Sequence, residues 1–206
     1  MKQAKTSNAW MKEHVNDFFV KQAKKDGYRS RAAYKLLEIH ERDKLFKPGM
    51  VVVDLGAAPG SWSQVVANKV GRNGKVVAID LLEMAPMLGV EFIQGDFRED
   101  SILNDLKIRL ESRSLDLVIS DMSPNVSGIK LSDQARSMHL AELALEFSIE
   151  RLNPGGSFLV KVFQGYEFDQ FLLSMRAGFD RVIIRKPKAS RDRSKELYLL
   201  GSGKKL

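Results

Sequence analysis

Short apolar runs rich in Val, Ile and Leu alternate along this chain with longer segments whose apolar residues recur at helical spacing. The apolar runs predict strands at residues 51–55, 75–80, 90–96, 115–121, 157–163, 181–185 and 196–200. Helical spacing lies between them, at residues 61–70, 100–111, 133–152 and 168–177. This alternation predicts an α/β fold with a mostly parallel, doubly wound sheet. The last two strands have only a short link, so they should pair antiparallel.

Two further helices are expected before the first strand. Residues 13–25 carry apolar side chains at helical spacing, and Ser30 is a suitable N-cap for a helix over 31–42. A later Ser132 or Asp133 is expected to cap the long helix, which Pro154-Gly155-Gly156 should stop. We expect a single domain over 1–206, with a basic arm and helix over 1–25 and a core over 26–201.

A glycine turn between the first predicted strand and the next helix forms a candidate binding corner. Asp54 closes the strand, and Gly56 and Gly60 bracket the turn. The glycines let the backbone approach a ligand, and the helix N-terminus offers free N–H groups. An ordinary strand-to-helix turn is the alternative, but the acidic strand end and the Pro59-Gly60 pair favour binding. The turn lacks the G-x-G-x-x-G pattern, which argues against NAD.

Four consecutive strands end in a carboxylate: Asp54, Asp80, Asp96 and Asp121. Ligands of such sheets bind at the carboxyl ends of the strands, so these residues predict an acidic crevice. It would repel an anionic cofactor and suit one with positive charge and ribose hydroxyls. Asp80 lies about 20 residues past the turn, where an acidic residue typically binds ribose hydroxyls.

Composition narrows the class of protein. The chain has 206 residues, 44% of them apolar and 29% charged, and no apolar run long enough to span a bilayer. There is no signal-peptide pattern at Met1 and no Cys, which fits a cytoplasmic protein. The only histidines, His14, His40 and His139, do not form a ligand spacing, so no metal site is expected.

Positive charge gathers at the two ends of the chain. Residues 1–47 hold 12 Lys or Arg against 6 Asp or Glu, and residues 181–196 hold 7 against 2, within a net charge of +7. Such ends suit a polyanion such as RNA, although basic tails can also serve solubility alone. The residues that we interpret as phosphate contacts are Arg29, Arg31, Lys186, Lys188, Arg191, Arg193 and Lys195.

Lys161 stands out because it lies inside the apolar fifth strand. A buried amine is costly unless it has partners or a task. Desolvation favours the neutral form of an amine, and a neutral amine can accept a proton.

Four segments resemble the RrmJ/FtsJ family of ribosomal RNA 2′-O-ribose methyltransferases. They begin at Ser30, Asp54, Asp121 and Leu159, and read Ser-Arg-Ala-Ala-Tyr-Lys-Leu, Asp-Leu-Gly-Ala-Ala-Pro-Gly-Ser-Trp, Asp-Met-Ser-Pro-Asn and Leu-Val-Lys-Val-Phe. The similarity covers about 24–201. It implies a Rossmann-like S-adenosylmethionine-dependent methyltransferase fold with seven strands, the last antiparallel, and helices on both faces.

The resemblance also implies a catalytic Lys-Asp-Lys-Glu tetrad, which falls on Lys35, Asp121, Lys161 and Glu196. It implies S-adenosylmethionine contacts at Gly60, Trp62, Asp80, Asp96 and Asp121. Trp62 could instead be a core aromatic, and Met84, Met87 and Met122 are interpreted as packing. Ser61 departs from the family, where a second Gly is frequent.

The resulting hypothesis is methylation of a uridine 2′-hydroxyl of 23S rRNA in the large ribosomal subunit. Lys161 would be the general base, oriented by Asp121, while Lys35 and Glu196 position the ribose. The alternatives are a tRNA or cap 2′-O-methyltransferase of the same family, a non-catalytic RNA-binding assembly factor, and, more distantly, a dehydrogenase. We expect ribosomal RNA as partner, no membrane, and a monomer.

Overall fold

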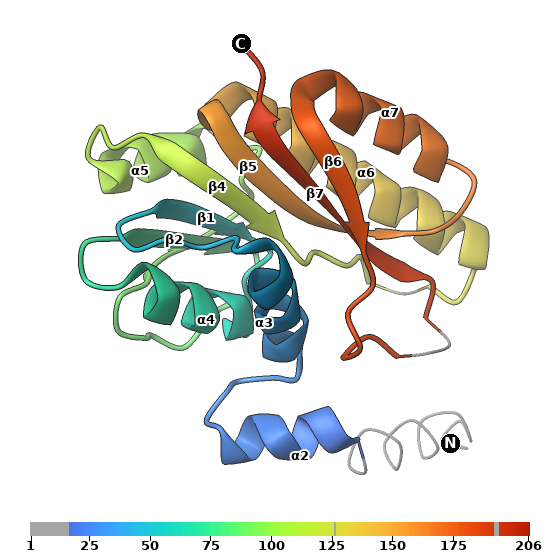
Figure 1. Cartoon of the computed structure of the whole chain (residues 1–206), viewed down its shortest axis with the longest axis horizontal. Coiled ribbons are helices and arrows are strands. Elements are labelled where there is room, and N and C mark those ends of the chain that lie inside the picture. Colours follow the sequence, from blue (N-terminus) through green and yellow to red (C-terminus); the bar gives the residue numbers. More distant parts are fainter. Residues whose placement is uncertain (1–16, 126, 192–193) are drawn as a thin grey trace.

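The computed structural model describes residues 17–125, 127–191 and 194–206. Within them the helices are α2 (Phe18–Lys25), α3 (Ala32–Asp43), α4 (Ser61–Val70), α5 (Asp100–Leu110), α6 (Lys130–Arg151) and α7 (Phe168–Gly178). The strands are β1 (Val51–Leu55), β2 (Lys75–Asp80), β3 (Glu91–Gln94), β4 (Leu115–Ser120), β5 (Leu152–Phe163), β6 (Phe179–Arg185) and β7 (Glu196–Lys204). Figure 1 shows these elements around one central sheet.

The seven strands form one sheet in the order β3-β2-β1-β4-β5-β7-β6. β1 to β5 pair in parallel, and β7 runs antiparallel to both β5 and β6. The predicted mostly parallel sheet with an antiparallel last strand is therefore confirmed. Strand order reverses between β1 and β4, and a ligand crevice is expected outside the carboxyl ends of strands at such a point.

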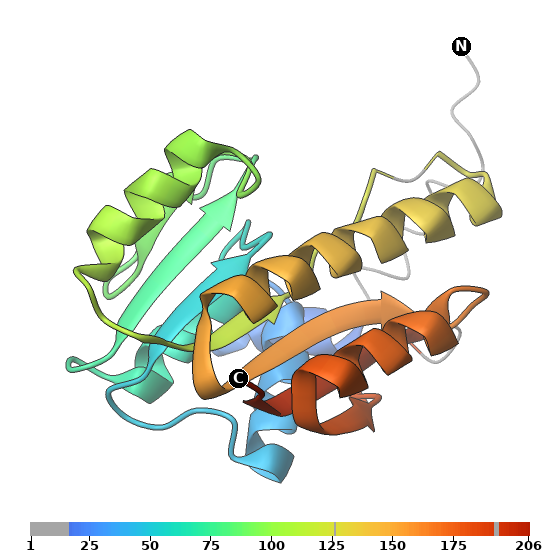
Figure 2. The ribbon, with the colours of Figure 1, turned by 90° about the horizontal axis from the view of Figure 1, so that it is seen from above.

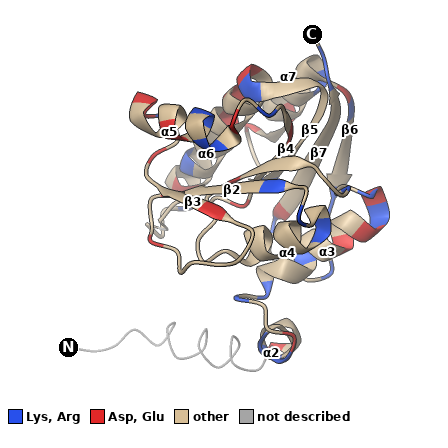
Figure 3. Ribbon diagram, turned by 90° about the vertical axis from the view of Figure 1, so that its left-hand side faces the viewer, with Lys and Arg blue, Asp and Glu red and all other residues tan. Residues whose placement is uncertain are grey.

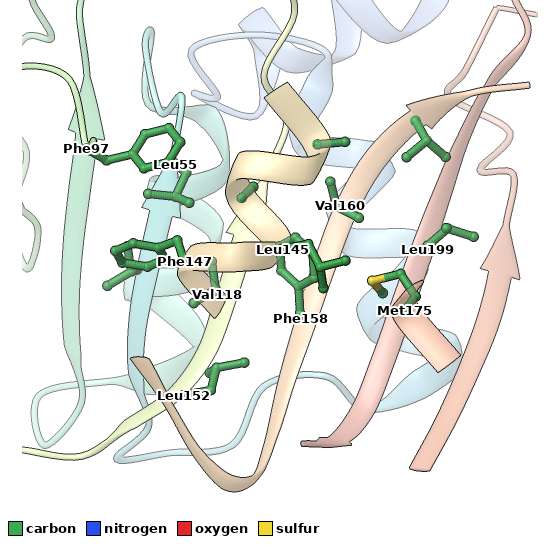
Figure 4. Close-up of a cluster of buried hydrophobic side chains, with 14 of the residues drawn as sticks. Leu55, Phe97, Val118, Leu145, Phe147, Leu152, Phe158, Val160, Met175 and Leu199 are labelled. Carbon is green, nitrogen blue, oxygen red and sulfur yellow. The ribbon is translucent and has the colours of Figure 1, made fainter. Parts of the chain in front are cut away.

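Helices cover both faces of the sheet, as expected. One core packs α3 and α4 against the sheet, and the other packs α5, α6 and α7 against the opposite face. Figure 2 shows the sheet between these two layers. Alternation along β1 explains the division, because Val52 contributes to the first core and Val53 to the second. Figure 4 shows the second core, where Phe147 and Leu145 of α6 lie over the sheet.

The expectation about the start of α6 is wrong. The helix begins at Lys130, with Ile129 at its cap, instead of at Ser132 or Asp133. The Asp133 carboxylate accepts hydrogen bonds from the backbone N–H groups of Ser127 (2.8 Å) and Gly128 (3.0 Å), so it secures the preceding loop.

The helix ends at Arg151, within one residue of the expected end at Leu152 and before the Pro154-Gly155-Gly156 segment. That segment belongs to β5, which starts at Leu152 directly after the helix. A register shift between Leu115 and Leu117 in the β4–β5 pairing accommodates the irregular residues within the strand.

The N-terminal region adds α2, which Figure 1 shows beneath α3 and away from the sheet. Asp17 caps it by accepting hydrogen bonds from the backbone N–H groups of Phe19 (2.8 Å) and Val20 (3.3 Å). The expected start of this helix at 13 and the arm over 1–10 lie outside the described residues. Within 17–206, apart from 126 and 192–193, no helix is long and apolar enough to cross a bilayer.

Candidate active site

Lys161 lies in the middle of the sheet with its amine against Asp121. Its Nζ donates a hydrogen bond to the backbone carbonyl of Asp121 (2.7 Å) and lies 3.1 Å from the Asp121 Oδ1 atom. The residue is only 7% exposed. The expectation of a buried Lys161 beside Asp121 is confirmed, because β5 and β4 are neighbours and Asp121 directly follows β4.

Tyr198 joins the two halves of the predicted tetrad. It pairs with Lys161 across the β5–β7 ladder, and its hydroxyl lies 3.0 Å from Asp121 Oδ1 and 3.1 Å from Glu196 Oε1. Complete burial raises the pKa of Tyr198 well above 10, and the charges of Asp121 and Glu196 raise it further. The hydroxyl therefore keeps its proton, and its single O–H is a hydrogen-bond donor that the two carboxylates share.

Sequence reasoning missed Tyr198. The available signal was its position two residues after Glu196, which places both side chains on one face of a strand.

Lys35 and Glu196 form the other half of the site. The Lys35 amine, on α3, lies 2.7 Å from Glu196 Oε1 and 5.8 Å from the centre of the Tyr198 ring. Ser190 donates a further hydrogen bond of 2.9 Å to the same carboxylate oxygen. The four residues predicted from sequence are thus connected by direct contacts through Tyr198.

A cavity of about 310 Å³ opens beside Asp121 at the carboxyl ends of β1, β2 and β4. Asp80, Asp96 and Asp121 line it. A small cavity of about 50 Å³ adjoins it, and Asp54 and Asp121 line this one. Gly56, Ala58 and Asp121 line both cavities, so the four strand-end carboxylates border one acidic crevice, as the sequence predicts.

Asp54 is the most buried of these carboxylates. Its Oδ2 accepts a 2.6 Å hydrogen bond from Ser63, whereas its Oδ1 is buried with no hydrogen-bond partner among the described residues. Burial raises the pKa of Asp54 to about 7, and the charges of Asp121 and Asp80 act in the same direction. An unpaired buried carboxylate oxygen beside a small cavity suits a cationic hydrogen-bond donor.

Asp80 and Asp96 are held differently. The two oxygens of Asp80 accept hydrogen bonds from the backbone N–H groups of Ala58 and Leu82, both 2.8 Å. The Arg98 guanidinium donates hydrogen bonds to both carboxylate oxygens of Asp96 and so lowers the pKa of this carboxyl. Asp80 is thus fixed between the glycine turn and the end of β2, with lone pairs left for a hydroxyl group.

Gly60 and Trp62, at the glycine turn, are both in close contact with neighbouring segments of the chain. Gly60 has φ +100, and an added Cβ there would press on the tips of Met84, Met87 and Arg29. Trp62 is 3% exposed, and its Nε1 donates a hydrogen bond to a backbone carbonyl of α3 (2.9 Å). Gly60 and Trp62 remain predicted cofactor contacts, with Trp62 also lining the small cavity.

Ser61, which departs from the family pattern, joins two helices. Its hydroxyl lies 2.6 Å from that of Ser30, so the start of α4 is linked to the segment before α3. The Ser30 hydroxyl also accepts a hydrogen bond from the backbone N–H of Ala32.

Arg29 and Arg31 bind other parts of the chain, which changes their interpretation as phosphate contacts. Arg29 donates to the carbonyls of Pro59 and Pro86, both at 2.9 Å. Arg31 pairs with Asp17 and donates to the carbonyl of Ala189, in the basic loop that follows β6 and contains Lys186 and Lys188. These guanidinium groups hold α2, the glycine turn and the basic loop together.

The sheet order, with antiparallel β7 and an acidic crevice at the switch point, is that of a Rossmann-like methyltransferase fold. No group of three or more side chains that could hold a metal occurs in the described part of the chain. The model of the FtsJ-like methyltransferase family matches residues 28–204. The chain belongs to this family.

Individual relatives agree with the assignment. The chain is 69% identical to the Ribosomal RNA large subunit methyltransferase E of Nitrosospira multiformis and 61% identical to that of Chromobacterium violaceum, each over the full length of both chains. Among solved structures it is similar to one described as a ribosomal RNA methyltransferase of Plasmodium falciparum. That likeness has a TM-score of 0.76 and 31% identity, and covers 86% of this chain and 98% of the other.

Proposed function

We propose that this protein transfers a methyl group to the 2′-hydroxyl of a uridine in the 23S rRNA of the large ribosomal subunit. The observation that carries the proposal is the connected network from Lys161 through Asp121, Tyr198 and Glu196 to Lys35, at the rim of the acidic crevice. The names of the relatives, which are ribosomal RNA large subunit methyltransferases, support the substrate.

Lys161 acts as the general base. A neutral amine has two N–H donors and one lone pair, and Asp121 offers two acceptors, its backbone carbonyl and Oδ1. With both N–H groups directed to Asp121, the lone pair is left for the proton of the ribose hydroxyl. Positioning of this kind makes a large contribution to such a transfer, because the methyl donor is already activated.

Lys35 and Glu196 position the ribose. Their ion pair is only 13% and 12% exposed at the side chains, so its geometry is restricted by packing. Tyr198 is a positioning residue, because its hydroxyl separates the carboxylates of Asp121 and Glu196 and fixes the distance between the two halves of the site.

S-adenosylmethionine is the methyl donor that fits the crevice. When bound, it supplies an electrophilic methyl group on a positively charged sulfonium. The unpaired Oδ1 of Asp54 suits the ammonium group of such a cofactor, and Asp80 suits its ribose hydroxyls. The proposed contact set is completed by Asp96, Asp121, Gly60 and Trp62.

RNA binds at the basic side of the molecule. Figure 3 shows Lys and Arg on α2, which holds three lysines and no acidic residue, and residues of both signs on α3. Lys186 and Lys188, in the loop that follows β6, are exposed. This loop is attached to α3, because the backbone N–H of Lys188 donates to Glu38 Oε2 (2.7 Å), so the basic segments form one surface beside Lys35.

The test is transfer of labelled methyl from S-adenosylmethionine to large ribosomal subunits from a strain that lacks this gene. Small subunits, naked rRNA and tRNA are tested in parallel as alternative substrates. We expect label on large subunits, mapped to a 2′-O-methyluridine. Lys161→Met, which keeps side-chain length and removes the amine, should lower the rate at least about 100-fold and leave cofactor affinity within about threefold.

Each other outcome has a distinct meaning. Label on tRNA would retain the chemistry and assign a different RNA. No transfer to any RNA, despite cofactor binding, would contradict the enzymatic assignment and favour a binding factor. Normal transfer by folded Lys161→Met would remove Lys161 from its role as base.

We further propose that the chain acts as one domain, with 26–201 as the catalytic core and 1–25 as a basic arm and helix. We propose a monomer that works in the cytoplasm, where ribosomal subunits are found. Light scattering after size exclusion tests the monomer, and a dimer mass at micromolar concentration would contradict it.

A further inference from the structure

A second cavity adjoins the acidic crevice. It has a volume of about 420 Å³, within the range of small-ligand sites, and Ser123 lines both cavities. Its walls come from three places: the segment after β4, the start of α6, and the ends of β5 and β7 that face each other.

This cavity lies close to the reacting groups. Ser123 follows Asp121 by two residues, and Phe163 follows Lys161 by two residues. Phe163 also pairs with Glu196 in the β5–β7 ladder. Two residues of a strand span roughly 7 Å, so a ribose held at Lys161 would place its base, or that of the adjacent nucleotide, at this cavity.

Gln134 supplies unused hydrogen-bonding capacity there. Gln134 lines the cavity, and its Nε2 is buried with no hydrogen-bond partner among the described residues. Gly165 leaves the room for this amide, because a Cβ at that position would overlap it. A ligand with a carbonyl next to an N–H would complete the hydrogen bonds of this amide. The terminal side-chain torsion of Gln134 has a broad energy minimum, so a small rotation would turn the amide toward the ligand.

The remaining walls have the chemistry of single-stranded RNA recognition. Phe163 offers an aromatic ring, and Lys130 and Lys195 offer cations for phosphates. Tyr166, three residues beyond Phe163, is 93% exposed. An aromatic ring beside lysines and an amide nitrogen without a partner are typical of a site that stacks a base and reads its edge.

We propose that this cavity binds a nucleobase of the RNA substrate next to the methylated ribose, with Gln134 at the hydrogen-bonding edge of the base and Phe163 in stacking contact. The inference rests on the proposed function in so far as RNA is the substrate. Uracil suits the site, since its edge carries the carbonyl and N–H groups that pair with a primary amide.

The first test measures binding of the full chain to two RNA hexamers by fluorescence anisotropy. One hexamer has uracil at a central position and the other is abasic there. We expect the abasic RNA to bind about tenfold more weakly. Gln134→Met and Phe163→Leu should each remove most of that difference. The matched control Gln170→Met, an exposed glutamine on α7, should keep it. Equal binding of both RNAs by the unmodified protein would overturn the inference.

The second test separates this inference from the proposed function. On large subunits, Gln134→Met should raise KM about tenfold, with cofactor affinity unchanged within about twofold. If the unmodified protein and both cavity variants methylate subunits equally, the base site is wrong and the proposed function stands. If the unmodified protein methylates no subunit yet distinguishes uracil from the abasic position, the base site stands and the proposed function is wrong.

Discussion

Asp54 shows how a single residue can reduce stability for the benefit of binding. It is 1% exposed, one of its oxygens lacks a partner among the described residues, and its pKa is raised to about 7. Burying a carboxylate in this way is unfavourable unless a ligand completes its contacts.

Stability should therefore depend on pH through Asp54. Its pKa rises from 3.8 to about 7 on folding, so between these values the folded chain holds a proton that the unfolded chain has lost. Its contribution falls as pH rises through this window. Asp54→Asn, which cannot ionise, should raise the free energy of unfolding by about 2 kcal/mol at pH 8 and change it little at pH 4, measured by urea denaturation. The exposed Asp169→Asn serves as control, and an equal effect at both pH values would contradict the assignment.

The same substitution should weaken cofactor binding. Asn at position 54 removes the negative charge that faces the small cavity, so we expect about tenfold lower affinity for S-adenosylmethionine at pH 8 by calorimetry. In the unmodified protein the affinity should rise with pH as Asp54 loses its proton. An affinity that does not change with pH or with the substitution would argue that Asp54 has no contact with the cofactor.

Tyr198 has a role that only its hydroxyl can perform. Tyr198→Phe keeps the buried ring and removes the hydrogen bonds to Asp121 and Glu196, so we expect kcat to fall about tenfold. KM and cofactor affinity should stay nearly unchanged, and the profile of kcat against pH should shift because the two carboxylates lose their shared donor. An unchanged profile together with a simple loss of thermal stability would indicate a purely structural role.

At the scale of an element, the glycine turn and the start of α4 are held in place by side chains from other segments. Gly60 lies at the start of α4 with φ +100, and the tips of Met84, Met87 and Arg29 cover it. The carboxyl end of β1, the turn and α4 are thus held from one side by the methionines and from the other by the sheet.

Gly60→Ala should destabilise the protein by about 2 kcal/mol, because Ala disfavours this φ and its Cβ displaces the covering side chains. Cofactor affinity should fall with it. Gly49→Ala is the matched control, since Gly49 has φ +84 and no atom beyond its chain neighbours lies within 4 Å of an added Cβ. Only the backbone cost of about 1 kcal/mol is then expected at position 49. Denaturant titration measures both, and equal costs would show that packing over Gly60 contributes nothing.

At the scale of the whole molecule, charge is divided between an acidic crevice and a basic flank. Asp43 receives a bidentate contact from Arg185, at 2.8 and 2.6 Å, which secures β6 to α3 near the basic loop. Under the proposed function, a net charge of +7 with this distribution would attract RNA to one side and leave the crevice suited to a cationic cofactor.

The combined variant Lys186→Glu and Lys188→Glu should raise KM for large subunits at least about tenfold at roughly 0.1 M salt and leave kcat unchanged. It should also reduce the dependence of KM on salt, because fewer counterions are released on binding. Lys107→Glu, an exposed lysine on α5, is the matched control. If both variants raise KM equally, net charge matters and the basic loop does not form the RNA surface.

Local pattern was sufficient for most elements. β1, β2 and α4 have the predicted bounds, because a run of β-branched residues, a glycine turn and a helical spacing each specify their structure within a few residues. The grouping of Lys35, Asp121, Lys161 and Glu196 was also predictable, since resemblance located all four residues. Their catalytic roles stay a prediction. The start of α6 was not, because Asp133 could cap the helix or bind the loop, and only the position of Ser127 and Gly128 decides between them.

By itself the sequence determined the α/β sheet, the acidic strand ends and the buried Lys161, because each depends on residues adjacent in the chain or on the period of a strand. Only the tertiary structure decided that Tyr198 joins the proposed catalytic residues and that Arg29 and Arg31 bind carbonyl groups of distant segments. It also decided that Gln134 lines a cavity beside the site. The physical reason is that these roles depend on which groups lie within about 3 Å after distant parts of the chain have packed, and a hydrogen bond needs that proximity.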